Sequence, residues 1–95
     1  MSMKEAYEQK MQAQLDEWSA EIDKLKAKAD SAKTDAQLNY HKQVEELLSI
    51  RKAAANKLSQ LKNESGDAWE ELKAGIDDAW DSLADAFKSA ASKMK

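Results

Sequence analysis

The chain has 95 residues, with 15 basic and 18 acidic side chains and a formal net charge of −3. Apolar residues make up 42%, and the chain has no proline, no cysteine and only two glycines. Alanine, leucine, lysine and glutamate dominate, which indicates helix and excludes a β-sheet, a disulfide framework and a cysteine-based zinc site. The mild acidity argues against nucleic-acid binding, and no apolar run approaches the roughly 18 residues of a membrane span. The N-terminal segment also lacks the apolar core of a signal peptide, so we expect an all-α cytoplasmic protein.

One apolar stripe runs through nearly the whole chain at helical spacing, from residue 7 to residue 94. Its average step of about 3.6 residues lies between the heptad and the eleven-residue coiled-coil periods. Such a stripe predicts long amphipathic helices that pack as a coiled coil. Its large members, which we predict to form the helix–helix interface, are Tyr7, Met11, Leu15, Trp18, Ile22, Leu25, Tyr40, Val44, Leu47, Ile50, Leu58, Leu61, Trp69, Leu72, Ile76, Trp80, Leu83, Phe87 and Met94.

The first predicted element is a long amphipathic helix over residues 1–63, helical from about residue 3. Large apolar residues are missing from residues 30–35, but this segment contains no glycine or proline. We therefore expect the helix to continue through it as a thin stretch packed by alanine. At about 1.5 Å per residue, the whole helix would span roughly 90 Å.

A turn or hinge is predicted over residues 64–67, around Ser65, Gly66 and Asp67. Glycine is favoured just past a helix end because it adopts positive φ without strain, and Asp67 is a good N-cap with Glu70 three residues later. A second amphipathic helix then covers residues 68–95. Since the apolar spacing keeps its phase through Gly66, a continuous helix with a soft spot remains the alternative.

The second helix contains an eleven-residue repeat, because residues 67–77 and 78–88 share Ala, Trp and Leu at equivalent positions. If the chain reverses at Gly66, apolar positions on the two sides face each other with residue numbers that sum to about 130, such as Leu58 with Leu72 and Leu47 with Leu83. Residues 36–66 carry five bases and three acids, and residues 67–95 carry four bases and seven acids. This charge complementarity also favours an antiparallel helical hairpin.

The hairpin leaves the stripe of residues 7–32 without a partner in the chain. An exposed apolar stripe is unstable in water, and a short helical chain encloses little core by itself. Either a second copy covers this stripe, or the chain bends near residues 30–35 and closes a three-helix bundle. We favour self-association into a dimer or larger homo-oligomer, because the bend has weak sequence support.

No residue pattern predicts catalysis, a cofactor or a bound metal. His41 is the single histidine and has no acid or histidine at ligand spacing, so we expect a solvated side chain. Asp77, Asp81 and Asp85 fall on one helix face and could collect a cation weakly, but they are more typical of a solvated face. The three tryptophans lie at helical spacing, which is typical of a core.

The segments Lys4–Tyr7, Leu15–Trp18, Glu21–Asp30 and above all Ser65–Gly75 (SGDAWEELKAG) resemble small bacterial coiled-coil domain proteins of unknown function. That resemblance covers nearly the whole chain and implies a bacterial helical protein without catalytic residues. The eleven-residue repeat is also similar in style to exchangeable apolipoproteins.

Two functions follow as hypotheses. The first is a non-enzymatic structural or interaction protein that self-associates through the apolar stripe. The second is a reversible lipid-surface binder whose last helix opens and lies in the interface, as the apolipoprotein-like repeat implies. The acidic balance of residues 67–95 counts against anionic membranes but not against neutral lipid surfaces.

Overall fold

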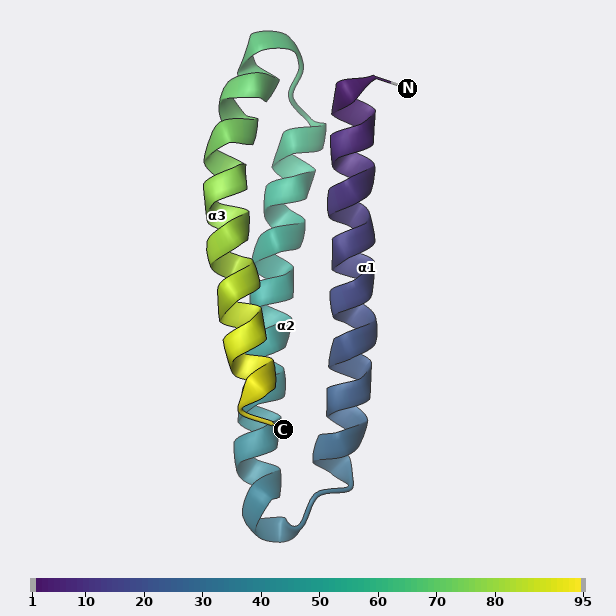
Figure 1. Ribbon diagram of the computed structural model, residues 1–95, viewed down its shortest axis with the longest axis vertical. Coiled ribbons are helices and arrows are strands. Elements are labelled where there is room, and N and C mark those ends of the chain that lie inside the picture. The colour runs from purple at the N-terminus through teal and green to yellow at the C-terminus, as the bar shows by residue number, and fades with distance from the viewer. Residues whose placement is uncertain (1, 95) are drawn as a thin grey trace.

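The computed structural model describes residues 2–94 and contains three helices joined by two short turns. They are α1 (Met3–Asp30), α2 (Thr34–Lys62) and α3 (Gly66–Ser92). In the view of Figure 1 the helices run down, up and down again, so α1 and α3 point the same way and α2 is antiparallel to both. The molecule is a rod of 52 × 21 × 17 Å. The all-α hairpin expected around Gly66 is confirmed.

The continuous helix expected over residues 3–63 is wrong. The chain leaves the helix at Asp30, turns through residues 31–33 and returns antiparallel to itself. The hydroxyl of Ser31 helps to end α1 by donating to the carbonyl oxygens of Ala27 and Lys28, at 3.1 and 3.2 Å. The bend gives up a few helical hydrogen bonds. In return it buries six α1 side chains, and a large apolar side chain contributes about 1.5–3 kcal/mol on burial.

The second turn, residues 63–65, separates α2 from α3. Gly66 has φ +62°, the only positive φ among the described residues, which confirms the prediction that this glycine reverses the chain. It stands at the start of α3, however, and not directly after the end of α2. The N-cap of α3 is Ser65, so the prediction that Asp67 caps this helix is wrong. Asp67 instead lies in the first turn, where its negative charge interacts favourably with the positive end of the helix dipole.

Gly66→Ala should destabilise the fold by about 1 kcal/mol, because an alanine side chain disfavours the left-handed backbone. A Cβ at this position meets no atom within 4 Å, so the effect comes from the backbone alone. Gly75 provides a matched control, since it lies inside α3, has ordinary φ and also leaves room for a Cβ. Gly75→Ala should stabilise the fold by about 0.5–1 kcal/mol. Urea denaturation of both variants measures the two signs, and shifts of the same sign would contradict this account of the turn.

A single apolar core runs along the axis between the three helices. It contains nineteen buried apolar side chains, and Leu47, Leu61 and Met94 are the largest that are fully enclosed. Both α1 and α3 pack along α2. The core continues from end to end because the sequence supplies an apolar residue at nearly every helical turn.

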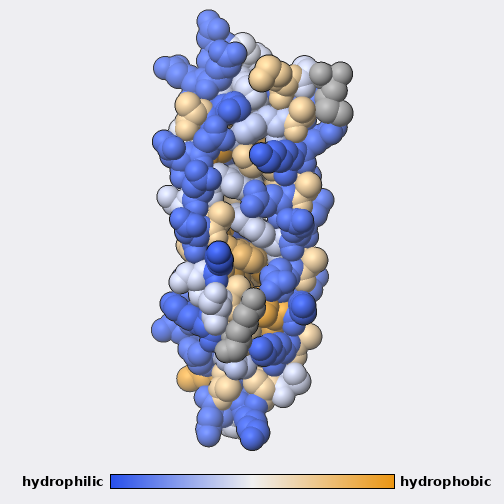
Figure 2. Space-filling view, viewed as in Figure 1, coloured by the Kyte–Doolittle hydropathy of each residue, from blue (hydrophilic) through white to orange (hydrophobic). Residues whose placement is uncertain are grey.

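The outer surface is largely hydrophilic, and apolar colour shows mainly along the line between α1 and α3 (Figure 2). α3 stops short of the turn that joins α1 to α2, so one end of the rod consists of two helices only (Figure 1). Among residues 2–94, three large apolar side chains are exposed, namely Met3, Leu38 and Leu48. Within residues 2–94, none of the helices has the continuous apolar length that a membrane span requires.

Candidate functional site

A cluster of polar and aromatic side chains joins α1 to α3 near the N-terminal ends of both helices. The phenol of Tyr7 on α1 donates a hydrogen bond to an Asp77 carboxylate oxygen on α3. Lys73, one turn before Asp77, donates to the other carboxylate oxygen at 3.0 Å and lies 4.7 Å from the centre of the Tyr7 ring. One carboxylate thus holds both a phenol and an ammonium group, and a cation–π contact completes the triangle.

The two hydrogen-bonded groups shift each other's titration. Burial raises the pKa of Tyr7 well above its ordinary value of 10.0, and the hydrogen bond to Asp77 and the negative charges of Asp77 and Asp81 raise it further. The pKa of Asp77 is lowered from 3.8, mainly by the hydrogen bond from Tyr7 and less by Lys73, while partial burial opposes the shift. Both shifts favour a protonated phenol beside an ionised carboxylate. That pairing is typical of a structural contact. A catalytic base near neutral pH would need a raised carboxyl pKa or a lowered phenol pKa, and both groups shift the other way.

The alkaline stability of the protein should depend on Tyr7. Since the fold raises the pKa of this phenol, the unfolded chain loses its proton first, and stability falls as the pH rises above about 10. The fall should be smaller in Tyr7→Phe, which has no phenol to ionise. Urea midpoints between pH 7 and 11 measure the effect.

Tyr40→Phe, which removes the other phenol of the chain, is the matched control and should keep the alkaline fall. An identical alkaline fall in Tyr7→Phe and the wild type would contradict the role assigned to Tyr7.

Asp77 affects stability at the acid end of the pH range. Its lowered pKa gives stability that is present above about pH 4 and lost on further acidification.

A second contact extends this cluster toward the end of the rod. The indole N–H of Trp69 on α3 donates to Glu8 on α1 at 3.1 Å, and Lys4 pairs with the same carboxylate at 3.2 Å. The rings of Tyr7 and Trp69 meet edge to face, with centroids 5.7 Å apart. The contact between α1 and α3 is called the α1–α3 seam below. The polar ends of its aromatic rings form hydrogen bonds at the edge of this seam, while their apolar bodies cover the core.

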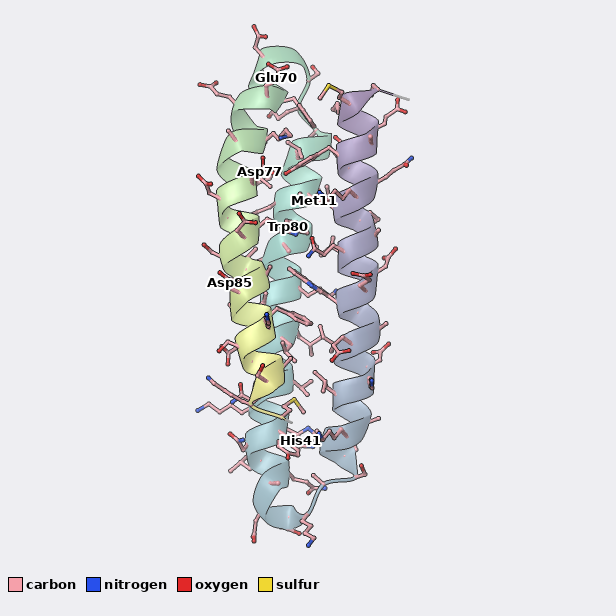
Figure 3. The ribbon with its side chains drawn as sticks, in the orientation of Figure 1. Met11, His41, Glu70, Asp77, Trp80 and Asp85 are labelled. Carbon is pink, nitrogen blue, oxygen red and sulfur yellow. The ribbon has the colours of Figure 1, made fainter. Side chains whose placement is uncertain are left out.

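Farther along the same seam, three aromatic rings form a stack. Trp18 of α1 lies between Trp80 and Phe87 of α3, with centroid distances of 5.6 and 4.8 Å and interplanar angles of 17° and 12°. The indole N–H of Trp80 donates to the side-chain oxygen of Gln14 at 2.6 Å. Trp80 accordingly lies in the space between α3 and α1 (Figure 3). Flat rings fill the gap between the two parallel helices.

The predicted interface residues all lie in or beside the core of the single chain. Fifteen of the nineteen are buried core residues, and the other four, which pack against this core half buried, are Tyr7, Tyr40, Leu72 and Leu83. The expectation that the stripe of residues 7–32 has no partner in the chain is wrong, because α2 and α3 cover it. Residue spacing could not reveal this, since an apolar stripe has the same pattern whether its partner is the same chain or another.

The other residues singled out in the sequence lie apart from one another. Asp77 is held by Tyr7 and Lys73, while Asp81 and Asp85 are exposed on the outer face of α3, where Asp85 is seen in Figure 3. Within residues 2–94, no group of three His, Cys, Asp or Glu side chains could hold a metal ion. His41 lies at the end of the rod that α3 does not reach (Figure 3), and its Nε2 is 3.5 Å from an Asp30 carboxylate oxygen. The bend of the chain makes this exposed pair, so the sequence spacing around His41 did not reveal it.

Sequence reasoning missed Gln43. This α2 side chain is only 6% exposed, and its amide oxygen has no hydrogen-bond partner among the described residues. A stripe of one apolar residue per turn predicts a narrow buried face. The middle helix of a three-helix bundle contacts two neighbours, so its buried face is wider and includes Gln43. A glutamine beside Val44 on such a face carries no local signal of its burial.

Gln43→Leu should stabilise the fold by about 1–2 kcal/mol. The change removes a buried acceptor without a partner and adds apolar contacts at similar volume. Thermal and urea denaturation measure the change, and Gln60→Leu, at an exposed position on the same helix, is the control. An equal or lower stability of Gln43→Leu would mean that the amide oxygen has a partner in solution.

Comparisons with protein-family models, with curated proteins and with solved structures give no significant match to this chain.

Proposed function

We propose that this protein is a non-enzymatic structural or interaction protein that self-associates through its helices. Its charged and aromatic groups support this function, because those with shifted pKa values or short contacts are joined to one another across the α1–α3 seam. Such groups add to helix packing rather than converge on a substrate. The partner proposed is a second copy of the same chain.

The observation that carries the proposal is the end of the rod that α3 leaves uncovered. Ala32, Ala36 and Tyr40 are only half buried there, although they continue the stripe whose other members form the core. Together with Lys28, Ser31 and Lys33 they line an open groove between α1 and α2. Apolar surface at the end of a rod is well placed for end-to-end contact with the same end of a second copy.

Sedimentation equilibrium at micromolar to millimolar concentration tests the proposal. Self-association predicts a species of twice the 10.6 kDa chain mass that grows with concentration. Ala36→Glu should shift the equilibrium toward the monomer, because it places a charge in the uncovered groove. An acidic residue is tolerated in the first turn of α2, so the fold should persist.

Leu38→Glu is the matched control, since it adds the same charge two residues away at a position that is 82% exposed. It should leave the association unchanged. A wild type that stays monomeric throughout the concentration range would contradict the proposed self-association, and equal effects of the two variants would contradict the groove as its site.

Reversible binding to a lipid surface is the second candidate function. The observation that favours it is the aromatic content of the α3 face, because Trp69, Trp80 and Phe87 would all be presented to an interface if α3 swung away from α1. Tryptophan is favoured at such interfaces, where its ring is buried and its N–H remains wet. The net negative charge of residues 67–95 selects neutral lipids.

Neutral phosphatidylcholine vesicles provide the test. Opening of α3 predicts a change in tryptophan emission on mixing, together with loss of the near-ultraviolet signal of the stacked rings. Vesicles of anionic lipid should produce a smaller change. Unchanged emission with both kinds of vesicle would contradict lipid binding and would leave self-association as the proposed function.

A further inference from the structure

We propose that two copies of this chain associate by exchanging α1. The turn at residues 31–33 would straighten, so that α1 and α2 become one continuous helix, and the α1 segment of each copy would pack on α2 and α3 of the other. This inference rests on the self-association proposed above and specifies its geometry. The resulting long helix of about 60 residues would span about 90 Å.

The buried residues of α1 and α2 share one helical phase. If α1 and α2 formed one straight helix, each residue would turn by about 100°. The thirteen buried positions of α1 and α2 would then fall within an arc of about 120°. A three-helix bundle does not need this agreement, because its turn can rotate each helix independently. A continuous helix does need it, since both halves must then present one face to the antiparallel helix of the partner.

The backbone of the turn at residues 31–33 needs little change to become helical. Lys33 has φ −63°, the value of a helix, and only its ψ of 151° departs from helical geometry. Ser31, with φ −95° and ψ 0°, is already close to the helical region. The turn contains no glycine and no positive φ, whereas the other turn is fixed by Gly66 at +62°. Straightening therefore requires rotation at a few bonds of residues that are all compatible with a helix.

The exchange would also cover the end of the rod that α3 leaves uncovered. In the exchanged dimer the two-fold axis passes near residue 36, midway between the numbers of the paired Asp30 and His41, and the small residues Ala32 and Ala36 let the two long helices approach each other there. The groove lined by Ala32, Ala36 and Tyr40 would become the middle of the assembly. α3 stops short of this point, so it leaves room for the crossing (Figure 1).

The contacts of α1 would be kept in the exchanged dimer, although each would join two chains. They include the hydrogen bond from Tyr7 to Asp77, the stack of Trp18 on Trp80 and Phe87, and the pair of His41 with Asp30. The dimer also gains the helical hydrogen bonds that the turn interrupts. Exchange is a low-cost route to a dimer because it needs no new interface.

Lys33→Pro tests the hinge. Proline has a φ near −65°, which matches Lys33 in the turn, and the Lys33 N–H donates to no backbone carbonyl among the described residues. In a continuous helix the same proline would clash with the preceding turn and weaken dimerisation by about 100-fold for each of the two hinges. Lys33→Ala is the matched control, since it removes the same charge but favours helix. It should dimerise at least as well as the wild type.

Spin labels measure the exchange directly in the otherwise wild-type chain. Gln12 on α1 and Ser59 on α2 line the same groove, are both exposed and can be replaced by labelled cysteines. In the three-helix monomer the two labels lie close together. In an exchanged chain their 47-residue separation places them about 70 Å apart. Dilution of doubly labelled chains with an excess of unlabelled chains removes the short distance between copies.

Each outcome decides a different point. A dimer with the long intrachain distance, suppressed by Lys33→Pro and not by Lys33→Ala, supports the exchange. A dimer that keeps the short intrachain distance, or that forms equally well in Lys33→Pro, overturns the exchange and leaves the proposed self-association intact. A chain that is monomeric at every concentration, also after heating and slow cooling, overturns both.

Discussion

Replacing Ile22 and Leu25 together by aspartate should unfold the protein. Both side chains are buried in the core, at 2% and 4% exposure, and face α2 and α3 along the middle of α1. Burial of a charge without a partner costs several kcal/mol at each site, and the whole stability of a small domain is only about 5–15 kcal/mol. Circular dichroism should show most of the helical signal lost, and limited proteolysis should cleave throughout the chain.

A control with the same two added charges separates burial from charge. Ala20 and Ala27 are exposed on the same helix, and their double replacement by aspartate should shift the urea midpoint only slightly. An Ile22/Leu25 variant that stays folded and loses only an oligomeric state would contradict this prediction. It would instead place the α1 stripe between copies in the resting molecule.

Replacing Trp18 by alanine should destabilise the fold by about 3–5 kcal/mol, the usual range for a large aromatic residue in a core. Trp18 is 8% exposed and is stacked between Trp80 and Phe87, so its removal leaves a cavity and ends both ring contacts. The position is also the main apolar bridge between α1 and α3, and its loss should loosen the seam between them. Urea denaturation measures the loss of free energy.

Trp18→Phe is the matched variant, because it keeps an aromatic ring at the centre of the stack. It should lose much less stability than the alanine variant and should retain part of the near-ultraviolet signal that stacked rings produce. A loss of less than about 1 kcal/mol in Trp18→Ala would mean that the three rings do not stack in solution. An equal loss in both variants would mean that the indole itself is required.

Local chemistry made the helices and their apolar faces predictable. Helix-forming residues dominate the chain, and the apolar spacing of about 3.6 residues identified buried positions such as Ile22, Leu47 and Trp80. The reversal at Gly66 was predictable for the same reason, because only glycine adopts φ +62° without strain. These properties depend on neighbours within a few residues, so the order of amino acids contains them directly.

The bend at residues 31–33 and the polar seam could not be predicted in this way. No local signal marks the bend, because Ser31, Ala32 and Lys33 are all compatible with a helix. The Tyr7–Asp77 bond and the burial of Gln43 arise only once α1 lies beside α2 and α3.

What the sequence alone determined is therefore which residues form helices, which face of each helix is apolar and where Gly66 reverses the chain. What the tertiary structure decided is the partner of that face, since in the described chain α1 folds back on α2 instead of extending away from it. The physical reason is that an apolar stripe gains nearly the same free energy from any complementary stripe, because the hydrophobic effect is proportional to buried area and has no direction. Helical spacing fixes the face to be buried, and only the packing of the whole chain fixes what buries it.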